Sequence, residues 1–546
     1  MKKVVYIFAG ILFSGWSFGQ TLESALEKTG NERYEEATSD YLHLIKSNPT
    51  DVKNYYFLGN NYYLFEKADS AKYYWNKAFQ TNAEDGLALV AKGKVDWLNG
   101  NQAAANASFD KALKDVKRKE KPEIYREIGS FLTFAPNRDL NKAISYLQEA
   151  VTLEPTNVDG HLLLGDALLE KTPEDGSPAI KEYNAAEQIH QSAKTIVRKA
   201  KLYQDARNYK LANEMYEQAK ALEPNYAPTY KAQAELQVLF QKYDLAIQNW
   251  QKYLSLNDNN YARYQYATAL FSAKKYCDAL QEASALKAKN YTSLYIERLI
   301  AYSTYDCQIE NNAIDTAKMK QGLQDIEAII AKIKDNKKEI SGYDYKYEGQ
   351  YLSKLGRNDE AIKAYYKAAE DTNVTVEVML DLAKTFNEQK KYDDAIKAYN
   401  TVIAIDSNKL KLTDYYQLAV LYFVNQDFVN SDRASQRMIE LSPNYSFAYF
   451  WRARANVYLD MDTTNANKPK AWSAAPFYQT FLDKLDPSYK ATYKDMEIEA
   501  YKYLSEYYST PEHKDLAKVK EIWTQVVALE PTNEAYQKKL EQVNKM

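Results

Sequence analysis

The residue types that most often carry out chemistry in proteins are few in this chain and widely scattered. Its four histidines and two cysteines stand at His43, His161, His190, His513, Cys277 and Cys307. None of them has the spacing of zinc ligands, and the sequence contains no HExxH, no CxxC and no glycine-rich phosphate loop. We therefore expect no catalytic residue, no metal ion and no cofactor.

Two further patterns could suggest chemistry, and neither is complete. The three motifs of penicillin-recognising serine enzymes have matches at Ser272, Ser442 and Lys28, but the Lys-Thr-Gly motif comes first along the chain instead of last. A run that begins at Asp460 is similar to a calcium loop, but it lacks the glycine and the glutamate that an EF-hand needs. The sequence thus predicts a protein that is not an enzyme.

The first nineteen residues have the layout of a secretory signal peptide. Two lysines precede an apolar run that ends at Phe13, and a small-x-small site ends at Gly19, directly before Gln20. The run is shorter than the ~20 residues that span a bilayer. We predict a signal peptide at 1–19 of the kind common in Bacteroidota, export to the periplasm or to the periphery of the outer membrane, and no transmembrane segment after cleavage. An uncleaved interfacial anchor is the alternative.

The overall composition argues against two classes of protein. The formal net charge is −3 and becomes more negative once the signal lysines are removed, so the chain does not suit the phosphates of a nucleic acid. A mean hydropathy of −0.61 does not suit an integral membrane protein. With 45% hydrophobic and 27% charged residues and only 16 glycines, the composition is typical of a folded, helix-rich protein.

The elements that would have to position any site are indicated by alanines that recur at one fixed interval. The interval is 34 residues within each of the sets Ala37, Ala71 and Ala105, Ala212 and Ala246, and Ala361 and Ala395. A bulky residue follows each of these alanines after four positions, and in several repeats a second small residue follows after seven, as at Tyr216 and Ala219. This spacing describes one face of a helix. A repeat of this length predicts stacked helix pairs instead of one globular core.

The repeated pattern resembles the tetratricopeptide repeat (TPR) family, whose unit is a pair of antiparallel helices. The resemblance is carried in two of the repeats by Tyr55, Leu58, Gly59, Tyr62, Ala71, Trp75 and Ala78, and by Tyr345, Gly349, Leu352, Ala361, Tyr365 and Ala368. It covers nearly all of residues 21–531. It implies an all-α fold, an α-solenoid that forms a right-handed superhelix of about 13–14 helix pairs with a C-terminal capping helix.

Breaks in the interval divide the predicted array. The motif is absent before Tyr345, and an insertion separates the repeat of Ser431 from that of Ala474. We predict an N-terminal array at 20–290, an irregular repeat at 291–341, a C-terminal array at 342–531 with an insertion at 459–473, and a capping helix at 532–546. The insertion either lies on a binding face or is a tolerated surface loop.

The resemblance also implies a binding groove, because the first helices of TPR proteins line a concave surface. The residues at the groove positions are Tyr56, Asn60, Tyr63, Tyr416, Val420, Phe423, Phe447, Phe450 and Arg454. The rings either anchor a partner or pack internally. The expected function is a non-catalytic scaffold or adaptor that binds other proteins of the cell envelope or the outer membrane. A glycan- or peptidoglycan-binding module is the alternative, because tyrosine rings also stack on sugars.

The two cysteines carry a separate prediction. Cys277 begins the second helix of the eighth repeat, and Cys307 ends the next predicted helix. Two antiparallel helices joined near Asn290 would place both residues at the open end of the hairpin. We predict a disulfide between them in an oxidising periplasm. Two buried free thiols are the alternative.

Overall fold

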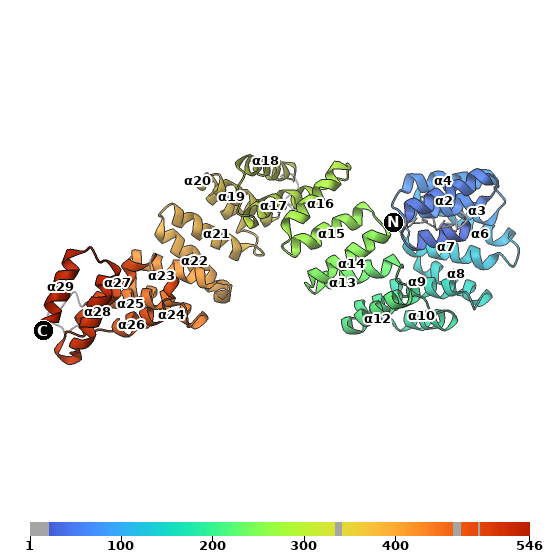
Figure 1. The fold of residues 1–546 in the computed structure, drawn as a ribbon. Helices are drawn as coiled ribbons and strands as arrows, with labels where there is room; N and C mark the ends of the chain where they lie inside the picture. Colours follow the sequence, from blue (N-terminus) through green and yellow to red (C-terminus); the bar gives the residue numbers. More distant parts are fainter. Residues whose placement is uncertain (1–20, 334–340, 462–470, 490–491) are drawn as a thin grey trace, which may run out of the picture. The chain divides into compact units, whose positions relative to one another are not determined.

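The structure is a computed structural model that describes residues 21–333, 341–461, 471–489 and 492–546. Over these residues the chain forms 29 α-helices, three short 3-10 helices and no strand (Figure 1). The predicted all-α fold is confirmed. The predicted signal peptide lies outside the described residues, as do positions 462–470 of the predicted insertion.

The chain divides into two compact parts, unit 1 up to Ser303 and unit 2 from Thr304. The first helices of the repeats in unit 1 are α1 (Leu22–Gly30), α3 (Val52–Leu64), α5 (Gly86–Leu98), α7 (Lys121–Phe134), α9 (Val158–Lys171), α11 (Ala193–Asp205), α13 (Ala227–Leu239) and α15 (Asn260–Ser272). The second helices are α2 (Tyr34–Ser47), α4 (Ala68–Thr81), α6 (Gln102–Asp115), α8 (Leu140–Leu153), α10 (Ser177–Ile189), α12 (Tyr209–Leu222), α14 (Tyr243–Leu256) and α16 (Tyr276–Ala288).

Unit 2 continues the alternation. The irregular pair is α17 (Leu294–Glu310), which begins before the division at Ser303, and α18 (Thr316–Ile333). The helices that follow are α19 (Gly342–Lys354), α20 (Asn358–Ala368), α21 (Thr375–Glu388), α22 (Tyr392–Asp406), α23 (Leu412–Val424), α24 (Phe428–Leu441), α25 (Ser446–Leu459), α26 (Ala475–Lys484), α27 (Lys494–Tyr507), α28 (Leu516–Leu529) and α29 (Glu534–Asn544). The 3-10 helices are Ser407–Lys409, Pro487–Tyr489 and Pro511–His513. Along the described chain there are thus fourteen successive pairs and one final helix.

In several repeats the two helices approach closely because a glycine of the first helix faces a ring of the second. A Cβ atom built on Gly59 would lie 2.3 Å from Cδ1 of Trp75, which is completely buried. Gly349 has the same relation to Tyr365, at 2.6 Å from Cδ1. The ring therefore occupies the space of the missing side chain, and this contact fixes the spacing of α3 with α4 and of α19 with α20.

Most turns within a repeat are closed by one residue in the left-handed region. Between α3 and α4 this residue is Glu66, with φ of 59°, and the N–H of Lys67 donates to the C=O of Tyr62 at 2.9 Å. This is the Schellman arrangement, which satisfies carbonyls at the end of a helix. The same conformation occurs at Lys390 and Gln426, with φ of 59° and 61°. Residues other than glycine adopt it at a cost of ~1–2 kcal/mol.

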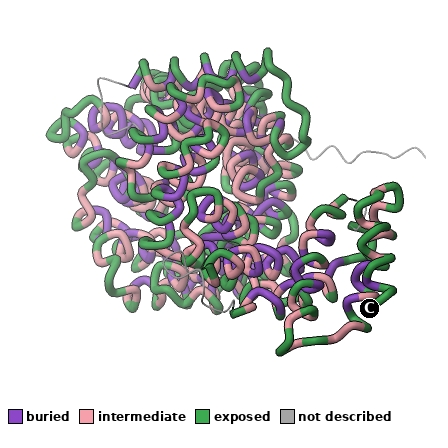
Figure 2. Tube along the Cα trace, turned by 90° about the vertical axis from the view of Figure 1, so that its left-hand side faces the viewer, coloured by how far each residue is buried: buried purple, intermediate pink, exposed green. Residues whose placement is uncertain are grey.

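The core of unit 1 is divided into several clusters of buried residues, most of which join neighbouring repeats. Buried segments alternate with exposed ones along each helix, and the exposed segments include the turns (Figure 2). One buried cluster extends from Ala25 to Ala143 and therefore spans the first four repeats. Near the C-terminus, α29 packs on α28, and the ring centroids of Tyr536 and Trp523 lie 6.0 Å apart. A capping helix covers the apolar side of the last repeat in this way.

Candidate protein-interaction surfaces

The first group of predicted groove residues lies on α3 in unit 1. Tyr56 is completely buried, and its hydroxyl donates to Oε2 of Glu127 on α7 at 2.6 Å. Asn60 is half-buried and donates to the same oxygen at 3.1 Å. Tyr63 is half-buried between Trp75 and Phe131, with ring centroids 5.5 and 5.9 Å away. Side chains from α3 therefore reach α7, two repeats along the chain.

A buried lysine occupies the space between these helices. Lys94 on α5 is 4% exposed, and its Nζ lies 3.3 Å from Oε2 of Glu127 and 2.9 Å from Oδ1 of Asn60. The ammonium group also lies 4.5 Å from the centre of the Tyr56 ring, a cation–π distance. Burial lowers the pKa of Lys94, although Glu127 opposes this effect. The ammonium group of Lys94 is therefore bound by side chains of the same protein, Glu127 and Asn60.

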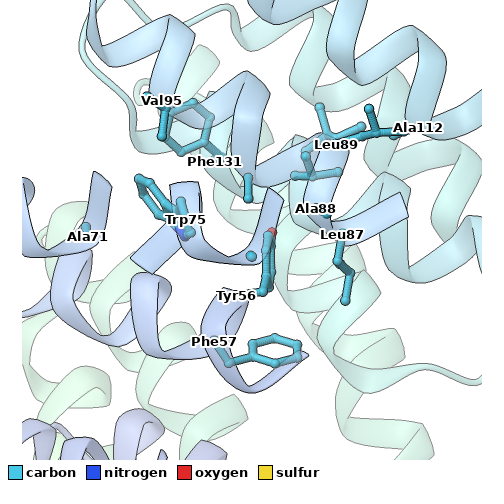
Figure 3. Packing of buried hydrophobic residues seen from close by; sticks show 14 of the residues in the cluster. Tyr56, Phe57, Ala71, Trp75, Leu87, Ala88, Leu89, Val95, Ala112 and Phe131 are labelled. Atoms are coloured by element: carbon cyan, nitrogen blue, oxygen red, sulfur yellow. The ribbon is translucent and has the colours of Figure 1, made fainter. Parts of the chain in front are cut away.

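The inner face of repeats two to four is consequently filled by the protein itself. Figure 3 shows Tyr56, Trp75 and Phe131 among the packed side chains of this region. The expectation that Tyr56 lines an accessible groove is wrong, because the ring has no exposed surface. Sequence reasoning missed Lys94 and Glu127, since the repeat pattern gives the direction of a side chain and not whether another repeat reaches it.

The second group of predicted groove residues lies on α23 and α25 in unit 2. Tyr416, Val420 and Phe423 on α23 are half-buried, so part of each side chain remains accessible. Arg454 on α25 has a side chain that is 32% exposed. Its guanidinium lies 4.9 Å from the ring centre of Phe423, and its Nε is 3.0 Å from Oε1 of Glu499. These contacts hold the arginine against the aromatic surface.

The other two predicted residues of α25 belong to the core. Phe450 is 1% exposed and Phe447 is 9% exposed. Phe450 packs on Phe481 of α26, with ring centroids 5.1 Å apart, and Phe447 packs on Tyr493 at 4.6 Å. The interpretation that these two rings bind a partner is therefore corrected: both rings pack inside the protein. We define the inner-face patch of unit 2 as Tyr416, Val420, Phe423 and Arg454.

Unit 2 also contains a group of carboxylates that the sequence did not reveal. Asp306 on α17 accepts a hydrogen bond from the Tyr347 hydroxyl, and Asp381 on α21 accepts one from Nε2 of Gln350 at 2.8 Å. Burial raises the pKa of Asp306 to about 6, and it also raises the pKa of Asp381. Lys346 opposes both shifts. The helix that carries Asp306 lacks the repeat motif, so its inward residues could not be aligned.

The cysteines lie where the repeat register predicts. Cys277 is the second residue of α16, and Cys307 is in the last turn of α17, which ends at Glu310. Neither is a free thiol in the described residues. A disulfide that forms on export to an oxidising periplasm stays a prediction.

We looked for metal sites and membrane-spanning helices in the part of the chain that the structure describes, and found neither. Within the described ranges, no three side chains of the types His, Cys, Asp and Glu are grouped so that they could hold a metal ion. None of the described helices combines the length and the apolar character needed to cross a bilayer.

We compared the chain with protein-family models, with curated proteins and with solved structures. The model of the tetratricopeptide repeat family matches residues 348–409, which include α20 and α21. No curated protein matches the chain. Among solved structures, the chain is similar to the C-terminal part of a TPR repeat-containing protein from Cytophaga hutchinsonii, with 28% identity and a TM-score of 0.40 over 51% of this chain and 99% of that chain.

Two more solved structures are similar over smaller shares of the chain. A tetratricopeptide repeat protein from Parabacteroides merdae has 18% identity and a TM-score of 0.31, over 46% of this chain and 93% of that chain. A thermophilic TPR protein from Thermus thermophilus has 19% identity and a TM-score of 0.28, over 40% of this chain and 100% of that chain. Given the family match at residues 348–409 and the fourteen successive helix pairs of the described residues, the fold is a tetratricopeptide repeat fold, which in general supports a scaffold for protein interactions.

Proposed function

We propose that this protein is a non-catalytic scaffold of the cell envelope that holds segments of partner proteins against its inner faces. The observation that carries the proposal is the inner-face patch of unit 2, where Tyr416, Val420 and Phe423 stay half-buried beside Arg454. Aromatic rings and arginine are the most frequent anchors of protein interfaces. The predicted signal peptide supports a place in the envelope.

Photo-crosslinking tests this proposal at a single position. A benzophenone amino acid in place of Val420 would sit within the patch, and the same group in place of Gln436 would sit on the exposed surface of the second helix α24. In live cells, we expect position 420 to capture one or a few envelope proteins that position 436 does not. The same capture pattern at both positions would contradict the proposal.

The glycan-binding alternative is favoured by a different surface. Tyr261, Tyr291 and Tyr295 in unit 1 are 44%, 38% and 64% exposed, and exposed tyrosine rings can stack on sugars. Pull-down from envelope extracts separates the two functions. Capture that survives digestion of the glycan strands but not of the proteins supports the scaffold, and the opposite result supports glycan binding.

A further inference from the structure

The turn between α1 and α2 contacts the seventh repeat, about two hundred residues further along unit 1. The Glu32 carboxylate in this turn accepts a hydrogen bond from the Tyr253 hydroxyl of α14 at 2.6 Å. Both of its oxygens lie 3.2 Å from Nζ of Lys231 on α13. Contacts between such distant repeats do not follow from stacking, which joins each repeat to its neighbours.

The backbone of Glu32 takes part in the same contact. Its C=O accepts a hydrogen bond from Nδ2 of Asn257 at 2.7 Å, and the same amide donates to the Tyr253 hydroxyl at 2.7 Å. Glu32 has a φ of 61°, so it is the left-handed residue that closes the first turn. The turn conformation thus presents both its side chain and its carbonyl to the seventh repeat. Burial and the Glu32 carboxylate raise the pKa of Tyr253, which keeps the hydroxyl protonated as a donor.

We propose that Glu32 is a releasable latch that closes the first seven repeats on themselves and covers the inner face of α13. The contact consists of hydrogen bonds and one ion pair, and a cavity of about 170 Å³ lies beside it, lined in part by Tyr34, Phe65 and Asn259. A polar contact next to a cavity large enough for water can exchange its bonds with solvent. The latch therefore opens without unfolding the repeats that it joins.

Release of the latch uncovers a cation beside an aromatic ring. Lys231 lies 5.4 Å from the ring centre of Tyr261, which is 44% exposed. With Glu32 withdrawn, an acidic segment of a partner can take its place on Lys231. This consequence rests on the proposed scaffold function, whereas the latch itself is a property of the free protein.

Distance measurements on the full chain without any partner test the latch. Spin-labelled amino acids are encoded at Ser39 of α2 and Ser255 of α14, both exposed, so that the cysteines are untouched. We expect one narrow distance distribution for the native protein and a broad distribution shifted to longer distances for Glu32→Ala. Glu36→Ala is the matched control, because Glu36 pairs with Arg33 in the same segment and stays exposed. It should leave the distribution narrow.

Chemical modification of Lys231 gives an independent readout of access. We expect the acetylation rate of Lys231 to rise at least ~10-fold in Glu32→Ala and to stay at the native rate in Glu36→Ala. Tyr253→Phe removes only the hydroxyl from a buried ring and should widen the distance distribution without loss of helical signal. A narrow distribution and an unchanged acetylation rate in both Glu32→Ala and Tyr253→Phe would overturn the latch, whatever partner the protein binds.

Discussion

At the residue scale, two neighbours on α25 have opposite roles. Phe450 is packed against α26, while Arg454, one helical turn later, lies on the accessible surface beside Phe423. Both stand at groove positions of the repeat. The helical period predicts that they share a face, but it does not predict that the next helix covers only the first of them.

Substitutions at these two positions should therefore separate stability from binding. Phe450→Ala removes a buried ring and should destabilise unit 2 by ~3–5 kcal/mol. Arg454→Ala removes a partly exposed ion pair and should change stability by less than ~1 kcal/mol, yet it should weaken crosslinking from position 420. Thermal melting followed by circular dichroism checks the first statement. A native melting curve for Phe450→Ala would mean that its ring is not part of the core.

A second prediction at this scale concerns Asp306 and pH. Because burial raises the pKa of its carboxyl from 3.8 to about 6, the unfolded chain loses this proton first as the pH rises. The stability that the neutral carboxyl contributes is present below about pH 4 and is lost as the pH rises through about 6, by up to roughly 3 kcal/mol. Asp306→Asn keeps an acceptor for the Tyr347 hydroxyl and should remove this pH dependence. Denaturant melts at pH 4, 5, 6 and 7 measure it, and equal pH dependence in both proteins would contradict it.

At the element scale, the glycine of a first helix sets how near the second helix lies. Gly59→Ala should lower stability by ~1–3 kcal/mol, because the added methyl group overlaps the Trp75 ring. Gly30→Ala is the matched control, since no atom lies within 4 Å of a Cβ built there. Alanine has the higher helix propensity, so this variant should be as stable as the native protein or slightly more so. Equal melting of the two variants would show that the ring moves aside at no cost.

The cysteine prediction concerns α16 and α17. Digestion under non-reducing conditions should yield one peptide pair that contains Cys277 and Cys307, and reduction should separate it. The bond closes a loop of about thirty residues, which in the chain-entropy model stabilises the protein by ~3–4 kcal/mol. Recovery of the Cys277 peptide as a free thiol from exported protein would end this proposal.

The repeats themselves were predictable from the sequence because the same spacing of small and bulky residues recurs along the second helix of most of them. Each alanine that centres a predicted repeat lies in or next to a second helix. The filled interior of repeats two to four was not predictable. It depends on the contacts of Tyr56 and Lys94 with Glu127, which lies 71 and 33 residues away in the sequence, and the pattern within a single repeat does not encode such contacts.

At the scale of the whole molecule, the predicted signal peptide bears on where the protein is located. If residues 1–19 are a cleaved signal peptide, the exported protein begins at Gln20, as N-terminal mass spectrometry of the periplasmic fraction would show. Replacement of Lys2 and Lys3 by glutamate should leave the full-length precursor in the cytoplasm, because the basic n-region is lost. A precursor that keeps its first nineteen residues in the envelope fraction would instead support an interfacial anchor.

The left-handed turns of the repeats have a consequence for protein engineering. Glu66, Lys390 and Gln426 hold a conformation that glycine adopts freely, and Gly100 and Gly356 already occupy it in sister turns. Glycine at each of the three sites would relieve strain and give a net gain of up to ~1 kcal/mol after its greater freedom in the unfolded chain is counted. Because the sites are far apart in sequence and share no partner, their gains in stability should add. A variant with all three glycines should therefore be more thermostable, without any change to the proposed binding surface.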